Sequence, residues 1–193
     1  MLDNLEKYKV ILASGSPRRR ELMAGLGVNY EVRILPYVDE SYPDTLQGEE
    51  IPLYIAKEKA DAYIPMMQPD ELIITADTIV WLDGEVLGKP RDREDALQML
   101  RTMSGRTHEV FTGVCITTTD WQRSFTAQTE VRFATLSEDE IIYYVDNFKP
   151  MDKAGAYGVQ EWIGFIGVEN ISGSYYNIMG LPVQKLYREL LKV

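Results

Sequence analysis

The stretch from Lys9 to Gly27 constrains the fold more than any other part of this chain. Its apolar residues 10–13 are typical of a buried strand, and the small residues 14–16 are too flexible to continue that strand. Pro17 fits the first position of a helix, and Gly27 suits the C-terminal cap of that helix. The sequence therefore predicts a strand, a tight turn and a helix in succession.

The start of this predicted helix carries an unusual charge. Its first turn is Arg18-Arg19-Arg20, although a helix N-terminus favours acidic residues. The repulsion falls if an anion binds there, and free backbone N–H groups, guanidinium groups and the hydroxyls of Ser14 and Ser16 could all donate to it. Ser16 would also serve as the N-cap. The pattern favours a phosphate-binding turn; the alternative is a solvated basic turn with Glu21 as counterion.

The overall charge makes this basic cluster more informative. The chain of 193 residues has 30 acidic and 20 basic residues, which gives a formal net charge of −10. Such a protein is repelled by nucleic acid and by anionic membranes unless its basic groups are clustered. We therefore expect a small polyphosphate ligand, with neither nucleic acid nor membrane as a partner.

Scarce cysteine and histidine exclude several kinds of site. Cys115 is the single cysteine, so an internal disulfide and a cysteine-based zinc site are excluded. His108 is the single histidine, and no G-x-S-x-G motif supports a serine triad around it. We expect His108 to be a strand residue with a structural hydrogen bond. The chain has no apolar signal core and no apolar run of membrane-spanning length, so a cytoplasmic location is expected.

Strand and helix signals alternate along the rest of the chain. They predict an α/β fold with a mixed sheet and one long hairpin. Strands are expected at 30–36, 72–82, 108–118, 125–136 and 162–168, with a hairpin turn at 83–84, and helices at 49–63, 92–105, 137–148 and 182–191.

Charged residues follow several of the apolar segments. Asp77 follows a buried strand and Lys89 follows the short hairpin, while Lys59 lies on or beside the inner face of its helix. In open α/β sheets the carboxyl ends of the strands converge on a shared crevice. Lysines there would hold phosphates, and a carboxylate would bind a divalent cation or accept a proton from water. Asp77 could instead cap a strand end, and Lys59 could lay its stem along the core. The Walker A and Rossmann motifs are absent.

Short motifs are spread over nearly the whole chain: 14–19 (SGSPRR), 76–78 (ADT), 87–90 (LGKP), 104–113 (SGRTHEVFTG), 152–160 (DKAGAYGVQ), 173–175 (GSY) and 180–182 (GLP). In this order they resemble the motifs of the Maf family of nucleoside triphosphate pyrophosphatases. The 152–160 segment resembles the branch that acts on dTTP and UTP.

This resemblance implies a single two-lobed α/β domain over residues 1–193, with a twisted mixed sheet and flanking helices like those of inosine triphosphate pyrophosphatases. It implies a divalent cation (Mg²⁺ or Mn²⁺), frequent homodimers, and hydrolysis of dTTP and UTP, or of modified pyrimidine nucleotides, to a nucleoside monophosphate and pyrophosphate. The alternative is a nucleotide-binding regulator of cell division without significant turnover. An intact Asp77 together with Lys59 and Lys89 favours the enzyme.

The resemblance also implies roles for individual residues. Asp77 would be the proton acceptor, and Glu40 and Asp77 would hold the metal. The substrate-binding positions are Ser14, Ser16, Arg18, Arg19, Lys59, Thr78, Lys89 and Gln160, among which Arg18, Thr78 and Gln160 match positions associated with base selectivity. Glu161 departs from the family pattern, where glycine often follows the glutamine, and adds negative charge near the expected nucleotide pocket.

Overall fold

The computed structural model describes residues 2–193, which fall into two compact units. Unit 1 runs to Asp77 and adds Thr112–Ala127 and Gly180–Val193. Unit 2 consists of Thr78–Phe111 and Gln128–Met179. Asp77 and Thr78, two of the predicted site residues, are therefore the consecutive residues at which the chain first passes from one unit to the other.

The strands of residues 2–193 form a seven-stranded sheet in the order β2-β1-β3-β5-β6-β7, with β4 paired to β3. β1 is parallel to both β2 and β3, whereas β4 is antiparallel to β3 and β7 is antiparallel to β6. The predicted mixed sheet is therefore confirmed. The strands are β1 (Lys9–Leu12), β2 (Glu31–Val32), β3 (Glu71–Leu82), β4 (Glu85–Leu87), β5 (Thr107–Thr117), β6 (Gln122–Phe133) and β7 (Val168–Ser172).

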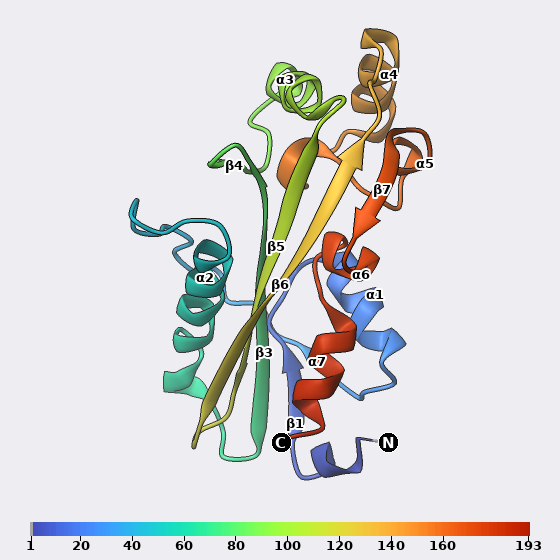
Figure 1. Cartoon of the computed structure of the whole chain (residues 1–193). Coiled ribbons are helices and arrows are strands. Elements are labelled where there is room, and N and C mark those ends of the chain that lie inside the picture. Colours follow the sequence, from blue (N-terminus) through green and yellow to red (C-terminus); the bar gives the residue numbers. More distant parts are fainter. Residues whose placement is uncertain (1) are drawn as a thin grey trace. The chain divides into compact units, whose positions relative to one another are not determined.

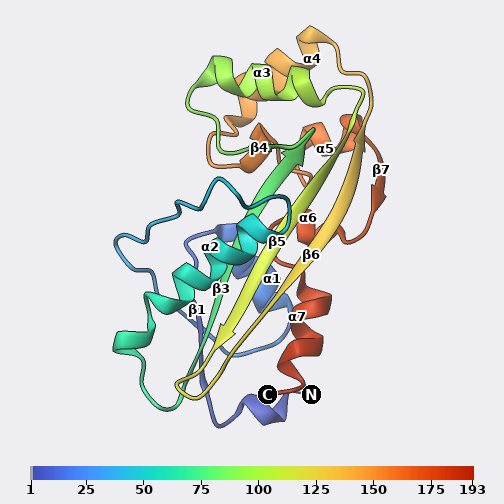
Figure 2. The ribbon, with the colours of Figure 1, turned by 60° about the vertical axis from the view of Figure 1, so that its left-hand side comes forward.

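Unit 1 packs helices on both sides of β1 and β3. Helix α2 (Glu50–Asp61) lies on one side, and α1 (Pro17–Gly25) and α7 (Val183–Leu190) lie on the other (Figures 1 and 2). The apolar residues of β1 and of the inner face of α2 are buried, as a strand covered on both faces requires. Two short 3₁₀ helices, Asp3–Leu5 and Ile64–Met66, complete the helical segments of this unit.

A close approach between α2 and β5 positions α2. A Cβ atom at Gly113 of β5 would collide with backbone atoms of Pro52 and Leu53 in the first turn of α2. Further along, Ala56 and Ala60 of α2 pack on Cys115 of β5, and all three are buried. Because these residues are small, the helix lies close to the strand, and the same helix carries Lys59.

In unit 2, helices α3 (Arg93–Met103) and α4 (Glu138–Phe148) lie side by side (Figures 1 and 2). Asp92 caps α3 by accepting a hydrogen bond from the N–H of Asp95 at 2.9 Å, and Ser137 with Glu140 forms a capping box on α4. Both helix starts match the sequence prediction. A 3₁₀ turn (Ala154–Ala156), α5 (Trp162–Gly167) and α6 (Tyr175–Ile178) make up the other helical segments.

The predicted strand at 162–168 is wrong. Residues 162–167 form helix α5, and β7 begins at Val168. A short apolar run does not distinguish a strand from a helix, and here burial follows the helical period: Ile163 and Gly167 are buried, whereas Phe165 is exposed. The other predicted strands and helices are present with shifted ends, and β2 is shorter than predicted. Within residues 2–193, no helix has the length and apolarity needed to cross a membrane.

Candidate active site

The turn between β1 and α1 is built by its two serines. Ser14 Oγ accepts a hydrogen bond from the N–H of Ser16 at 3.2 Å, and Ser16 Oγ accepts one from the N–H of Arg19 at 3.4 Å. The predicted N-cap at Ser16 is therefore confirmed. Both hydroxyl oxygens act as acceptors in these bonds, which leaves the O–H groups able to donate to an anion at the helix N-terminus.

The two arginines of this turn differ in their surroundings. Arg19 donates through Nε to the carbonyl of Gly180 at 2.7 Å and through Nη1 to the carbonyl of Ala76 at 2.9 Å. Burial lowers the pKa of Arg19, and the nearby charge of Asp77 opposes that shift. Arg19 thus ties α1 to the residue that precedes Asp77. Arg18 lies half-buried in the same first turn.

Unit 1 brings three charged site residues together. Lys59 Nζ lies 2.8 Å from Asp77 Oδ1 and 2.8 Å from Glu40 Oε1. The side chains of Lys59 and Asp77 are each 14% exposed, whereas that of Glu40 is 56% exposed. Helix α2 supplies the lysine, β3 supplies Asp77, and Glu40 comes from the segment between β2 and α2. One ammonium group therefore joins both carboxylates that were predicted to bind metal.

This donor set fits a divalent cation that also binds phosphate. Mg²⁺ is usually held by one or two carboxylates together with substrate phosphates, rather than by an all-protein cage. Glu40 and Asp77 both contact Lys59 Nζ, so their carboxylates lie near one another. Across residues 2–193, no group of three or more histidine, cysteine, aspartate or glutamate side chains could hold a metal ion. Glu40 and Asp77 could therefore supply two of the oxygen ligands of such a cation.

Unit 2 holds the other predicted site residues. Thr78 lies in β3 directly after Asp77, and Lys89 is exposed just after β4. The N–H of Gly155 donates to the carbonyl of Gly88 at 3.0 Å, which joins the glycine-rich loop 152–160 to the residue before Lys89. Gly155 has φ 67°, and a Cβ there would lie 2.9 Å from Val80 Cγ2, so this crossing requires glycine.

Gln160 ends this loop, and the residue after it is well paired. Gln160 is half-buried, and the described residues 2–193 provide no hydrogen bond to its side chain. Glu161 Oε1 lies 3.0 Å from Lys153 Nζ, and Glu161 Oε2 accepts a short hydrogen bond from the hydroxyl of Tyr144. The Glu161 carboxylate is therefore paired with a lysine, which it shares with Asp152.

His108 has the structural role that was predicted. Its Nε2 lies 2.7 Å from the hydroxyl of Tyr157, and both side chains are buried. The rings of His108, Tyr157 and Phe133 meet edge to face, with centroids 5.0 to 5.3 Å apart. Burial lowers the pKa of His108 to about 4, so the imidazole is neutral at pH 7. This contact also anchors the loop that ends at Gln160.

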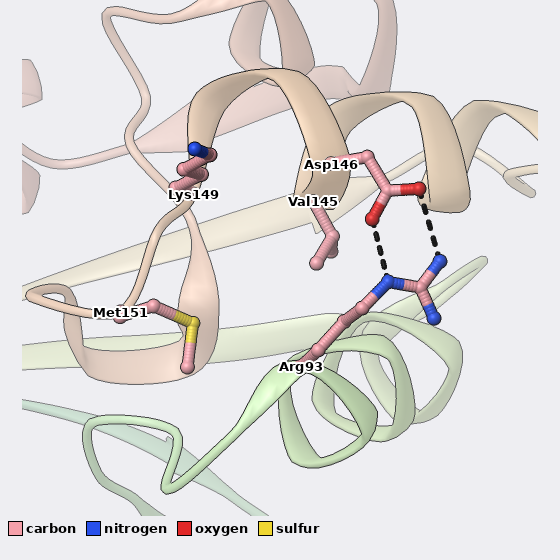
Figure 3. Close-up of a pocket in the computed structure, with 5 residues that line it drawn as sticks. All are labelled: Arg93, Val145, Asp146, Lys149 and Met151. Carbon is pink, nitrogen blue, oxygen red and sulfur yellow. Dashed lines mark hydrogen bonds and ion pairs between the residues drawn. The ribbon is translucent and has the colours of Figure 1, made fainter.

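Unit 2 also has a pocket, and none of the residues that line it is a predicted site residue. It has a volume of about 310 Å³. Figure 3 shows Arg93 and Asp146 joined by two hydrogen bonds, of 2.6 and 3.0 Å, at its edge. The pocket is lined by Arg93, Val145, Asp146, Lys149 and Met151.

Comparison with solved structures defines the class of fold. The Ham1 protein of Staphylococcus aureus superposes with a TM-score of 0.52 at 16% sequence identity, over 94% of this chain and 99% of that chain. A HAM1 protein from Coxiella burnetii gives a TM-score of 0.53 at 14% identity, over 96% of this chain and 100% of that chain. The chain therefore has the α/β fold of the Ham1 proteins, and at this identity the likeness concerns the fold alone.

The sequence comparison gives the family. The Maf-like protein family matches residues 9–193, and this chain belongs to that family. A dTTP/UTP pyrophosphatase of Bacteroides thetaiotaomicron is 71% identical over 193 residues, which is 100% of both chains. A dTTP/UTP pyrophosphatase of Bacteroides fragilis is 70% identical over 190 residues, or 98% of both chains. One from Porphyromonas gingivalis is 55% identical over 192 residues, covering 98% of this chain and 96% of its own.

Proposed function

We propose that this chain is a nucleoside triphosphate pyrophosphatase that hydrolyses dTTP and UTP to the nucleoside monophosphate and pyrophosphate. The observation that carries the proposal is that Asp77 and Glu40 both form ion pairs with Lys59. These residues supply a proton acceptor, a cation for phosphate and two carboxylates for a metal ion. The chain is also 71% identical over its full length to a protein named dTTP/UTP pyrophosphatase.

In the proposed reaction Asp77 accepts a proton from water. The water oxygen forms a bond to the α-phosphorus, the bond from that phosphorus to the bridging oxygen breaks, and pyrophosphate leaves with the electron pair. Lys59 contacts Oδ1 of Asp77, and the described residues 2–193 provide no hydrogen bond to Oδ2. Oδ2 is therefore the oxygen suited to hold the attacking water.

The phosphates would be held by cationic groups and by the first turn of α1. Arg18 and the Ser14 and Ser16 hydroxyls belong to this turn, where backbone N–H groups favour an anion. Lys59 and Lys89 supply further positive charge. A bound Mg²⁺ or Mn²⁺ on Glu40 and Asp77 would offset the negative charge of the phosphates.

Gln160 would recognise the base. Gln160 offers an amide donor and an amide acceptor, which suits the alternating donor and acceptor groups of uracil and thymine. Thr78, and Arg18 of unit 1, are the other positions proposed to influence base selectivity.

The test is a product analysis with a nucleotide panel. Purified protein is incubated with dTTP, UTP, CTP or GTP in Mg²⁺ or Mn²⁺, and pyrophosphate and inorganic phosphate are measured separately. We expect pyrophosphate from dTTP and UTP, loss of activity in excess EDTA, and ¹⁸O from labelled water in the nucleoside monophosphate. Inorganic phosphate with a nucleoside diphosphate would contradict the proposed bond cleavage. Nucleotide binding without turnover would instead support the regulator of cell division.

Two further expectations accompany this function. We expect a homodimer, which light scattering on the purified protein would detect as twice the mass of the chain. We also expect a cytoplasmic enzyme, because the proposed substrates are free nucleotides; fractionation of cells that express the protein tests this location.

A further inference from the structure

We propose that Lys153, Glu161 and Tyr144 are positioning residues that fix the backbone on both sides of Gln160 and thereby set its preference among pyrimidine bases. This inference rests on the function proposed above, because it concerns how that site selects its substrate. We call these three residues the loop clamp.

The loop clamp joins the two ends of the glycine-rich loop. Lys153 lies at the start of the loop, Glu161 directly follows Gln160, and their charged atoms are 3.0 Å apart. The Lys153 side chain is 9% exposed and the Glu161 side chain is 21% exposed, so water screens this ion pair less than a surface pair. Lys153 also contacts Asp152 Oδ1 at 2.9 Å.

Tyr144 holds the loop from α4. Its hydroxyl donates to Glu161 Oε2 and accepts a hydrogen bond from the N–H of Gly158 at 2.9 Å. Tyr144 is fully buried, and both burial and the Glu161 carboxylate raise its pKa, so the hydroxyl keeps its proton and can donate it. One hydroxyl group therefore binds residues on both sides of Gln160.

The packing around these contacts leaves little room for movement. A Cβ atom at Gly158 would lie 2.9 Å from Glu161 Cδ and 3.1 Å from Lys153 Cε, so the paired side chains lie directly against this glycine. A Cβ atom at Gly164 would collide with the carbonyl oxygen of Val159. The N–H of Gly164 also donates to the carbonyl of Glu161 at 2.9 Å. The backbone before and after Gln160 is thus held by short contacts within unit 2.

Gln160 differs from its neighbours in this respect. Its side chain is half-buried and has no hydrogen bond from residues 2–193, whereas Gly158 and Glu161 are both hydrogen-bonded to Tyr144. A side-chain amide can turn to pair with either uracil or cytosine. A preference for one base therefore requires that the amide, and the backbone that carries it, are held in a fixed position. A rigid backbone at Gln160 restricts the positions that the amide can take. The contacts of Glu161 with Lys153 and Tyr144 supply part of this rigidity.

The experiment compares kcat/KM for UTP and CTP in wild type, Tyr144→Phe and the double variant Lys153→Met/Glu161→Gln. Tyr144→Phe keeps the ring and removes the hydroxyl, and the double variant removes both charges together, so no buried charge is left unpaired. We expect the UTP-to-CTP ratio to fall about ten-fold in each, mainly through a lower kcat/KM for UTP. Asp146→Asn, which breaks the exposed Arg93–Asp146 pair of the same unit, should leave the ratio unchanged.

Two direct measurements accompany the kinetics. Hydrogen exchange should show faster exchange at the Gly158 amide in Tyr144→Phe, because that amide loses its acceptor. Dissociation constants for UTP and CTP, measured by calorimetry in the Asp77→Asn background, give the same selectivity without turnover. If wild type releases no pyrophosphate, the proposed function fails, and the ratio of dissociation constants still tests the loop clamp.

Several results would overturn the inference. One is an unchanged UTP-to-CTP ratio in folded Tyr144→Phe and in the double variant, even if both rates fall equally, since that would make the clamp purely structural. Another is a wild type that turns over and binds UTP and CTP equally, because there would then be no selectivity to maintain. In that case the pyrophosphatase activity would still stand. The variant Lys153→Arg keeps the positive charge. A UTP-to-CTP ratio in Lys153→Arg closer to wild type than that of the double variant would support a positioning role.

Discussion

Lys59 Nζ lies 2.8 Å from Asp77 Oδ1 and joins a helix to a strand across 18 residues of sequence. The same nitrogen lies 2.8 Å from Glu40 Oε1. Lys59 was expected either to lay its stem along the core or to contact a ligand, and the structure shows it paired with the two carboxylates proposed to bind metal. This pairing orients one oxygen of Asp77 and brings Glu40 next to it.

The first prediction concerns Asp77. Asp77→Asn should retain nucleotide binding but lower kcat by about 10²-fold or more, because an amide cannot accept the proton from water. The measurement is steady-state pyrophosphate release together with a calorimetric dissociation constant for UTP, with a thermal melt as the folding control. Near-normal turnover in a folded variant would remove Asp77 from the mechanism.

The second prediction concerns the close approach of α2 to β5. Gly113→Ala places a methyl group against the backbone of Pro52 and Leu53, so it should lower the free energy of unfolding by about 2–3 kcal/mol or prevent folding, and displace Lys59. Chemical denaturation measures the first effect and kcat/KM the second.

Gly25→Ala is the matched control for Gly113→Ala. Gly25 lies at the end of α1, and a Cβ there meets nothing within 4 Å. This variant should be neutral or raise the free energy of unfolding by about 0.5–1 kcal/mol, because alanine loses less backbone entropy than glycine. Equal effects of the two substitutions would show that the packing at Gly113 is not tight.

Much of the fold could be predicted from the sequence because local signals agree with it. The N-caps at Ser16, Asp92 and Ser137 depend on side chains that bond to the backbone three residues away, and such short-range contacts are visible in sequence. The hairpin turn at 83–84 is present for the same reason, since Asp83 and Gly84 adopt the positive φ values that this pair tolerates. These elements required no knowledge of the tertiary structure.

The contacts that sequence reasoning missed are long-range. Helix α5 was predicted as a strand because its short apolar run carries no clear period. Leu136, which lies against Gly167, comes from a distant part of the chain. Tyr144 gave no sign of its bond to Gly158, 14 residues away. Lys153 and Glu161 offered one usable signal, since opposite charges bracket a loop of small residues.

The third prediction is a pH dependence caused by His108. Burial lowers its pKa in the folded protein to about 4, from 6.5 in the unfolded chain. Between these values the unfolded state binds a proton that the folded state does not, so stability is lost as the pH falls from 6.5 towards 4. From pH 7.5 to pH 4.5 this contribution should amount to about 2–3 kcal/mol.

His108→Gln removes this titration and isolates its effect. Urea denaturation of both proteins at several pH values gives the difference in unfolding free energy between wild type and variant. As the pH falls from 7.5 to 4.5, wild type should lose about 2–3 kcal/mol of unfolding free energy relative to His108→Gln. A difference that is constant with pH would mean that His108 has a similar pKa in both states.

The fourth prediction concerns the first turn of α1. Arg18→Ala should weaken triphosphate binding by about 1.5–3 kcal/mol, the range for a charge-assisted hydrogen bond. Without ligand it should leave stability unaltered or slightly raise it, because it removes positive charge from a helix N-terminus. Calorimetry and thermal melts measure the two effects. A large loss of stability without nucleotide would assign Arg18 to the fold rather than to phosphate binding.

The last prediction tests the selectivity residue itself. Uracil and thymine present O4 and O2 acceptors beside the N3–H donor, whereas cytosine has an amino group at position 4 and an unprotonated N3. An oriented Gln160 amide that pairs with the first pattern is left unpaired by the second, which costs about 1–3 kcal/mol. Gln160→Ala should therefore narrow the preference for dTTP and UTP over CTP and GTP, mainly by lowering kcat/KM for the two good substrates. The measurement is kcat/KM for these four nucleotides in wild type and variant, with Asp146→Asn as the control for unit 2. If wild type already treats all four alike, Gln160 has no part in selecting the base, and hydrolysis to pyrophosphate remains to be judged on Asp77 alone.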